Sequence, residues 1–356
     1  MARVTVSVPG KLILMGEHAV VYGRPALVAA LDRRLTVRVA PRPDGAVHLD
    51  LPGLGHAEET SWEALREYAH SVRESWHAYS RRPSPESFRA VQREDPAHVV
   101  KVALGEVAAE TLMGLSLRVE SDLPIGSGFG SSAATAVAVI AGALAFRGVP
   151  LDPRRIEPLA LEVERRQHGL PSGVDSAAVL FGGLLWAQKL AAGGLETERL
   201  PATSPLLSRL RVYDTGTPAE STGAVVAAVR SRRDRDPAAL ESLLDRIEAA
   251  TRGFRAQLEL PVEDAAVTVD LIREGHACLQ ALGVVPDEVS ALIRHVEAEG
   301  GAGKLSGAGA LSGPGAGCVL VYHPDTERIA AWPFLQSLSF HAVHLGADGL
   351  RRETDA

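Results

Sequence analysis

Alternating apolar and polar positions predict several strands near the N-terminus. Thr5–Val8 begins an alternating run, and Lys11–Leu14 continues it up to a Gly-Glu-His turn. Ala26–Leu31 is a short apolar segment, and in Leu35–Val39 apolar residues alternate with polar ones. This period is typical of a half-buried strand. The segment 41–55 contains Pro and Gly without a sustained period, which predicts turns and a hairpin.

Helical spacing appears in the polar segment 58–93. Trp62, Leu65, Ala69 and Val72 recur every three or four residues, which predicts a helix lying on the surface. The same period predicts further helices over 97–111, 131–146, 153–166, 221–232, 237–259, 262–282 and 286–299. Strands are predicted over 115–119, 181–187, 210–213 and 318–322.

Mixed strands and helices in two halves predict an α/β or α+β chain. The length of 356 residues favours two domains. Gly and Pro cluster over 191–205, where the periodicity lapses. We therefore expect one domain over 1–200 and a second over 201–356.

Composition and charge exclude several classes of protein. Hydrophobic residues make up 46% and charged residues 23%, as in a globular chain, and the net charge of −7 argues against a general nucleic-acid binder. Cys278 and Cys318 form no CxxC pair, so we expect neither a disulfide scaffold nor a zinc site, and a cytoplasmic location. No signal-peptide pattern occurs at the N-terminus. The longest apolar stretch, 131–146, falls short of the ~20 residues that span a bilayer, so no membrane partner is expected.

The sequence DLPIGSGFGSSAA carries the clearest candidate chemistry. Its alternating Gly126, Gly128 and Gly130 let the backbone approach a ligand and adopt positive φ. Ser131 and Ser132 follow at the predicted start of a helix. The unpaired N–H groups and the positive end of the helix dipole would suit a polyphosphate.

Better-known nucleotide motifs do not fit this segment. The dinucleotide pattern GxGxxG would need Gly in place of Ser131. The Walker pattern GxxxxGK[ST] is absent, because Lys304 is followed by Leu305 and Ala298 stands where it needs Gly. A glycine-rich turn before a helix can also be a plain tight connection.

The sequence PGKLILMGEHAVVYG places Lys11 inside an apolar strand, with Glu17 and His18 at the turn that follows. Burying an unpaired ammonium group costs several kcal/mol. Alone, Lys11 is therefore expected at the edge of a sheet with its ammonium group in solvent. A nearby carboxylate would reverse that interpretation.

Such a carboxylate is available in ERRQHGLPSGVDS. Asp175 follows a Pro/Gly turn and precedes an apolar run, and its structural alternative is a helix N-cap. Taken alone, Glu164 is typical of a solvated helix face, and His168 of a turn.

Together these segments resemble the GHMP kinases, the family of galactokinase, homoserine kinase, mevalonate kinase and phosphomevalonate kinase. The resemblance rests on PGK near the N-terminus, PIGSGFGSSA in the middle and a glycine-rich loop over 304–317. KLILMGEHAVVYG, GLPSGVD and DTGTPAEST are most similar to the members that phosphorylate mevalonate. Two departures matter: Phe129 stands where the family usually has Leu, and about five extra residues interrupt the third loop, Lys304–Gly317.

The resemblance implies catalytic roles for two residues and metal-binding roles for two others. Asp175 would act on the attacking hydroxyl, as a base or as an electrostatic anchor. Lys11 would pair with Asp175 and with the transferring phosphoryl group. Ser132 and Glu164 match the positions that hold Mg²⁺ between the phosphates of ATP.

The resemblance also implies the binding residues. Glu17, His18 and Thr222 would place the acid substrate. The ATP phosphates would be wrapped by Gly126, Ser127, Gly128, Gly130, Ser131 and Ser132.

The family's fold implies an α+β, two-domain chain. Its N-terminal domain would resemble domain 2 of ribosomal protein S5, its C-terminal domain would be ferredoxin-like, and the site would lie between them. The implied reaction uses ATP and Mg²⁺ to convert (R)-mevalonate to 5-phosphomevalonate for isoprenoid biosynthesis, in a homodimer. Alternatives are another small-molecule kinase of the family, acting on phosphomevalonate or a sugar, a decarboxylase of the same fold, or an inactive homologue that senses ligands.

Overall fold

A computed structural model describes residues 2–82, 84–108, 113–124 and 126–354. Its larger sheet is built around two long antiparallel strands, β1 (Val4–Met15) and β2 (Pro25–Arg42). The two short segments predicted within β2 are thus one strand. Pairing with β1 continues through a register shift opposite Pro9 and Gly10, so the polar residues between the two apolar runs bend the strand without ending it.

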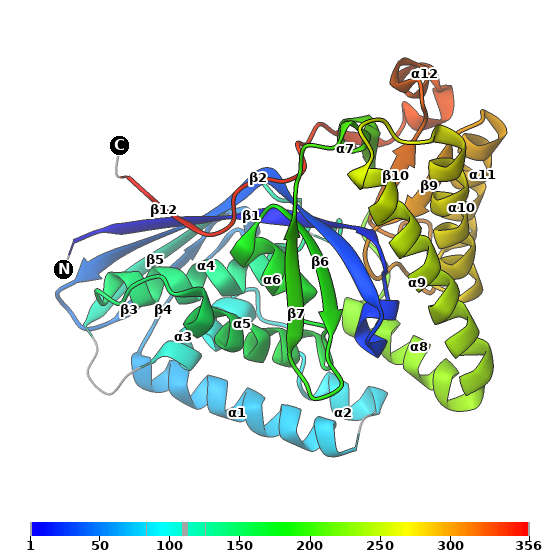
Figure 1. The fold of residues 1–356 in the computed structure, drawn as a ribbon. Coiled ribbons are helices and arrows are strands. Elements are labelled where there is room, and N and C mark those ends of the chain that lie inside the picture. Colours follow the sequence, from blue (N-terminus) through cyan, green and yellow to red (C-terminus); the bar gives the residue numbers. More distant parts are fainter. Residues whose placement is uncertain (1, 83, 109–112, 125, 355–356) are drawn as a thin grey trace.

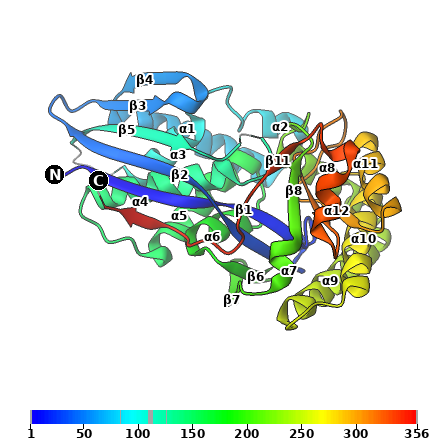
Figure 2. The same cartoon turned by 90° about the horizontal axis from the view of Figure 1, so that it is seen from above.

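Six shorter strands complete the larger sheet. Its order is β12-β1-β2-β5-β3-β4, with β6 and then β7 added beside β2. All neighbours are antiparallel except β3 and β5. Figure 2 shows β12 beside β1, with both termini at the same end of the sheet. The bounds are β3 Val47–Leu51, β4 His56–Thr60, β5 Gly114–Ser121, β6 Leu184–Lys189, β7 Leu195–Leu200 and β12 Arg351–Glu353.

Helices cover one face of this sheet in two layers (Figure 1). Helix α4 (Ser131–Phe146), buried along almost its whole length, lies on β1 and β2, where its many alanines allow close packing. Helix α1 (Trp62–Arg81) lies outermost and buries only one stripe, as predicted. The remaining helices of this half are α2 Pro85–Arg89, α3 His98–Val107, α5 Pro153–His168 and α6 Val174–Phe181. Of the predicted helix 97–111, residues 109–111 lie outside the described residues.

A second, four-stranded antiparallel sheet has the order β11-β8-β10-β9. Helices α9, α10 and α11 gather beside it (Figure 1) and share a separate hydrophobic cluster with it. The strands are β8 Leu210–Asp214, β9 Ala302–Leu305, β10 Cys318–Tyr322 and β11 Ser339–His341. The helices are α7 Pro205–Arg209, α8 Thr222–Arg235, α9 Pro237–Glu259, α10 Ala265–Ala281, α11 Asp287–Ala298 and α12 Thr326–Ala331. Short 3₁₀ turns span Ala19–Tyr22, Pro52–Leu54 and Pro333–Leu335.

The α+β fold class is confirmed by these two sheets and their helices. The segment 191–205, where the hydrophobic period lapses, contains β7, which pairs with β6 as a hairpin. The division into domains at about residue 200 stays a prediction. Cys278 and Cys318 are both buried free thiols. Within the described ranges, no helix is both long and apolar enough to cross a bilayer.

Candidate active site

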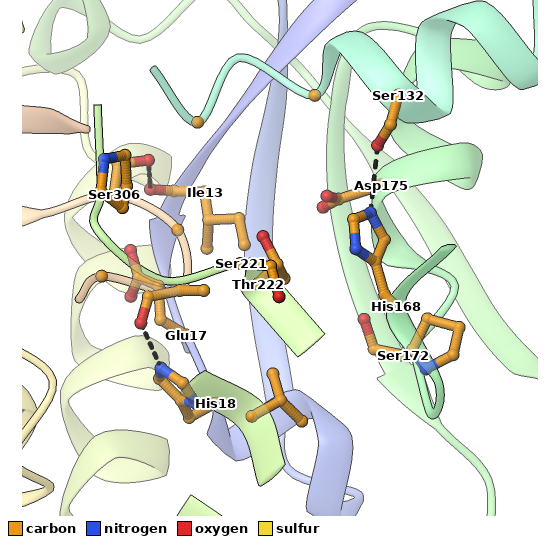
Figure 3. A pocket seen from close by; sticks show the side chains of 18 of the residues that line it. Ile13, Glu17, His18, Ser132, His168, Ser172, Asp175, Ser221, Thr222 and Ser306 are labelled. Atoms are coloured by element: carbon orange, nitrogen blue, oxygen red, sulfur yellow. Dashed lines mark hydrogen bonds between the residues drawn. The ribbon is translucent and has the colours of Figure 1, made fainter. Parts of the chain in front are cut away.

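A cavity of about 330 Å³ is lined by segments from both halves of the chain. In the view of Figure 3, Ser132, His168 and Asp175 lie on one side, and Glu17 and His18 lie on the other. The described residues that line it include Lys11, Glu17, His18, Gly126, Gly128, Gly130, Ser131, Ser132, Glu164, His168, Asp175, Glu220, Ser221, Thr222, Gly307, Ala308, Gly309 and Ala316.

Lys11 and Asp175 form an ion pair in this cavity. The Lys11 Nζ atom lies 3.0 Å from Asp175 Oδ1, and the lysine side chain is only 4% exposed. This carboxylate reverses the interpretation of Lys11 alone as an edge residue, and the pairing with Asp175 is the one that the resemblance implied. Asp175 is not an N-cap either, because Gly173 caps α6 and Asp175 lies in the first turn. There its carboxylate also faces the positive end of the helix dipole.

The phosphate loop packs directly against Lys11. Gly126, Gly128 and Gly130 all have positive φ, as predicted. A Cβ atom at Gly130 would lie 2.7 Å from Lys11 Cγ, so a side chain there would displace the lysine. The Lys11 N–H also donates to the Phe129 carbonyl at 2.9 Å. Ile125, within the loop's sequence, lies outside the described residues.

The structure places one predicted loop residue away from the cavity. The Ser127 hydroxyl is buried and donates to the Asp214 carboxylate at the end of β8. Its carbonyl accepts from the Cys318 N–H at 3.1 Å. Ser127 therefore joins the phosphate loop to the second sheet through its side chain.

Ser132 contacts His168, which the sequence alone assigned to a turn and to no role in the site. Its Oγ atom lies 3.0 Å from His168 Nε2, in the last turn of α5 (Figure 3). Burial, first of all, lowers the pKa of His168 to about 4, so the imidazole is neutral near pH 7. His168 occurs in the same motif as Asp175, and this proximity in the sequence could have indicated that His168 lies in the site.

Glu164 lies four residues before His168, so both side chains project from one face of α5 into the cavity. Taken alone, Glu164 was typical of a solvated helix face, and that interpretation does not hold, since the residue is only 3% exposed. Its Oε1 atom accepts hydrogen bonds from the Ser176 N–H at 2.8 Å and from the Ser176 hydroxyl. Burial, and then the negative charge of Asp175, raises the pKa of Glu164 to about 7.

This electrostatics fits a divalent cation. The Glu164 and Asp175 carboxylates lie close together beside Lys11, and their repulsion raises the energy of the state in which both are ionised. Magnesium prefers hard oxygen ligands and uses few from the protein. The Glu164 carboxylate and the Ser132 hydroxyl, both in the cavity wall, supply such ligands.

On the other side of the cavity, Glu17 is paired with Lys304 of β9. Both side chains are about 2% exposed, and the Lys304 Nζ atom also donates to the Leu305 carbonyl at 2.7 Å. Burial raises the pKa of Glu17 and lowers that of Lys304, and their mutual attraction opposes both shifts. The charge of Glu17, which lines the cavity, is thus balanced by Lys304, which lies behind the cavity wall.

His18 has an unusual backbone. Its φ of 60° is the single positive value at a non-glycine residue in the described part of the chain, and such strain often marks a functional site. The buried ring lies with Nε2 2.9 Å from the Ala308 carbonyl. Because a carbonyl only accepts, Nε2 carries the proton and Nδ1 remains an acceptor. Burial lowers the pKa of His18.

Thr222 begins α8 at the cavity wall, directly after Ser221, whose hydroxyl caps the helix by accepting from the Ala224 N–H at 3.3 Å. The third glycine-rich loop faces it through Gly307, Ala308, Gly309 and Ala316. At its start, the Ser306 hydroxyl donates to the Ile13 carbonyl at 2.9 Å, which ties the loop to β1 (Figure 3). Sequence reasoning left Ser306 and Glu220 unassigned.

Comparisons with known proteins identify the family of the chain. Residues 97–183 match the family model described as GHMP kinases N terminal domain. The chain is 32% identical to mevalonate kinase of Mus musculus, over 99% of this chain and 95% of that protein. It is 32% identical to mevalonate kinase of Archaeoglobus fulgidus, over 88% and 90%.

Solved structures share the fold. A mevalonate kinase crystal structure matches with a TM-score of 0.70 at 18% identity, covering 97% of this chain and 99% of that one. A Lactococcus lactis galactokinase complexed with galactose matches with a TM-score of 0.69 at 17% identity, covering 98% and 95%. The fold is therefore common to kinases of different acceptors.

Proposed function

The chain belongs to the GHMP kinase family and is 32% identical to mevalonate kinases of Mus musculus and Archaeoglobus fulgidus over most of its length. On that premise we propose that it phosphorylates (R)-mevalonate. The reaction would transfer the terminal phosphoryl group of ATP to the primary hydroxyl and yield 5-phosphomevalonate for isoprenoid biosynthesis. The observation that carries the proposal is the Lys11–Asp175 pair, which lies in one cavity with the phosphate loop.

In this proposal Asp175 orients the acceptor hydroxyl. Lys11 lies 3.0 Å from Oδ1, and Asp175 keeps 31% of its side chain exposed at the cavity wall, so its carboxylate remains accessible to a hydroxyl group. Asp175 would accept its proton or anchor it electrostatically. Lys11 would then balance charge on the transferring phosphoryl group, because such transfers depend on positioning and charge stabilisation.

The phosphate loop would hold ATP. Gly126, Gly128, Gly130, Ser131 and Ser132 line the cavity at the N-terminus of α4, where unpaired N–H groups favour anions. Ser132 and Glu164 would bind Mg²⁺, which would neutralise phosphate charge when bound. Ser127 would act indirectly, by fixing the loop to Asp214.

The acceptor would bind between the phosphate loop and the third loop. The Thr222 hydroxyl would donate a hydrogen bond to the acceptor, since Thr222 is the first residue of α8 and lines the cavity. Glu17 and His18 would shape the acceptor pocket, Glu17 held by Lys304 and His18 by the Ala308 carbonyl. His18 Nδ1 remains available as a hydrogen-bond acceptor.

ADP release in the presence of Mg-ATP tests the proposal with a panel of mevalonate, phosphomevalonate, galactose and homoserine. We expect turnover with mevalonate alone. The control is Asp175→Asn, which should keep the fold and lose at least about 100-fold in kcat, the usual scale for a positioned acid or base. Turnover with another acceptor would show that the proposed substrate is wrong, and nucleotide binding without turnover would point to a ligand sensor.

The homodimer is a separate proposal, and light scattering of the purified protein would test it.

A further inference from the structure

The third loop contains the extra residues beside the cavity. Gly309 and Ala316 both line the cavity, and residues 310–315 lie between them, with 311–314 exposed and Ala310 buried. We call residues 310–315 the protrusion. The base of this protrusion is held through backbone groups. The Ala310 N–H donates to the Val284 carbonyl at 3.0 Å, and the Ala316 N–H donates to the Thr215 hydroxyl at 2.9 Å.

The middle of the protrusion is held by Glu220. Its Oε2 atom accepts from the Leu311 N–H at 2.8 Å, and its Oε1 atom accepts from the Ser312 hydroxyl. Burial alone would raise the pKa of Glu220, but hydrogen bonds from Ser312 and Leu311 outweigh it and lower the pKa. The carboxylate is therefore ionised near pH 7, and both hydrogen bonds are charge-assisted.

Glu220 also belongs to the cavity wall. It lies two residues before Thr222, and Glu220, Ser221 and Thr222 all line the cavity. The hydrogen bonds to Leu311 and Ser312 therefore fix the start of α8 relative to the third loop. None of the described hydrogen bonds of Glu220 involves Lys11 or Asp175, so its action is separate from the reacting atoms.

We infer that Glu220 is a positioning residue for acceptor binding, which fastens the protrusion 310–315 to the start of α8. Fastened in this way, the third loop and Thr222 form one preorganised wall for the acceptor. Without this contact, ordering the wall on binding would cost free energy and weaken the affinity for the acceptor. The acceptor's identity rests on the proposed function, whereas the fastening itself does not.

Steady-state kinetics test the inference with Glu220→Ala, Glu220→Gln and Ser312→Ala. Because one charge-assisted hydrogen bond is worth roughly tenfold in an equilibrium, we expect Glu220→Ala to raise the KM of the acceptor about tenfold and to change kcat less than about twofold. Glu220→Gln retains an oxygen that accepts hydrogen bonds, so its acceptor KM should lie between those of Glu220→Ala and the wild type. Glu220→Ala should also be non-additive with Ser312→Ala, since the two residues share one contact.

Amide hydrogen exchange gives a readout that needs no substrate. The Leu311 amide should exchange faster in Glu220→Ala, and it should be unchanged in the control Glu299→Ala, which removes an exposed glutamate paired with Arg328. Faster exchange without turnover of any acceptor would support the fastening and reject the proposed function. Unchanged exchange, or a fall in kcat at constant KM, would overturn the inference.

Discussion

At the scale of single residues, Glu164 and His168 show how burial sets the chemistry of the cavity. They project from the same face of α5, and burial shifts their pKa values in opposite directions, to about 7 for Glu164 and about 4 for His168. Each shift favours the neutral form of the side chain. Near pH 7, His168 is therefore an uncharged partner for Ser132, whereas Glu164 is close to its midpoint and responds to any cation nearby.

The raised pKa of Glu164 predicts a pH-dependent stability. Its ordinary pKa of 4.5 is raised to about 7 in the fold, so the unfolded state holds fewer protons between these values. Its contribution to stability is complete below the unfolded pKa and is lost as the pH rises through about 7. In buffer without metal, we expect the Tm of the wild type to fall more from about pH 5 to about pH 8 than that of Glu164→Gln.

Addition of Mg-ATP provides the second half of that test. A cation that binds ionised Glu164 should recover the lost Tm at the higher pH in the wild type, and recover less in Glu164→Gln. Parallel Tm curves for the two proteins, with and without Mg-ATP, would contradict the assigned position of the metal.

At the scale of elements, the sequence pattern predicted the bounds of those helices that depend on nearby residues alone. The bounds of α4 follow from its alanine run and the glycines before it, and those of α9 from Pro237 and a sustained helical period. The burial of Glu164 was missed because it depends on α6, whose Ser176 lies 12 residues away and covers the carboxylate. The continuity of β2 was missed for a similar reason, since it depends on pairing with β1.

The phosphate loop predicts a difference between two glycines. Gly130 and Gly148 both have positive φ, at 74° and 77°, but only the Cβ atom at Gly130 would strike another residue, Lys11. Each change to Ala should cost about 1–2 kcal/mol of stability from the left-handed backbone. Gly130→Ala should also lower activity at least about tenfold by displacing the Lys11 ammonium group, since small misplacements are costly in catalysis.

Gly148→Ala is the matched control for that prediction. It carries a similar backbone cost in open space, so its activity should equal that of the wild type after correction for the folded fraction. Equal losses of activity in both variants would show that backbone strain, rather than the contact with Lys11, determines the effect.

At the scale of the whole molecule, the cavity depends on contacts between its two sheets. Glu17 follows β1 and Lys304 belongs to β9, and they are separated by 287 residues in the sequence. Motif resemblance placed both residues near a site, but no local pattern could pair them. The Ser127–Asp214 contact is of the same kind, since it joins the phosphate loop to the end of β8. These contacts join segments of the two sheets beside the cavity.

The Glu17–Lys304 pair predicts how the fold responds to loss of one partner. Lys304→Met would leave the Glu17 carboxylate buried without a counter-charge, which costs about 3–5 kcal/mol in comparable buried pairs. The double variant Glu17→Gln with Lys304→Met removes both charges and should recover much of that loss. Urea unfolding measures both.

The pH dependence of the single variant separates charge from packing. The pKa of Glu17 is raised in the fold, and without Lys304 it should rise further, because the attraction that opposes burial is gone. A raised carboxylate pKa favours folding at low pH and disfavours it as the pH rises. Lys304→Met should therefore lose more stability relative to the wild type at about pH 8 than at about pH 5. A loss independent of pH, and unrelieved by Glu17→Gln, would mean that the lysine stem supports the fold by packing alone.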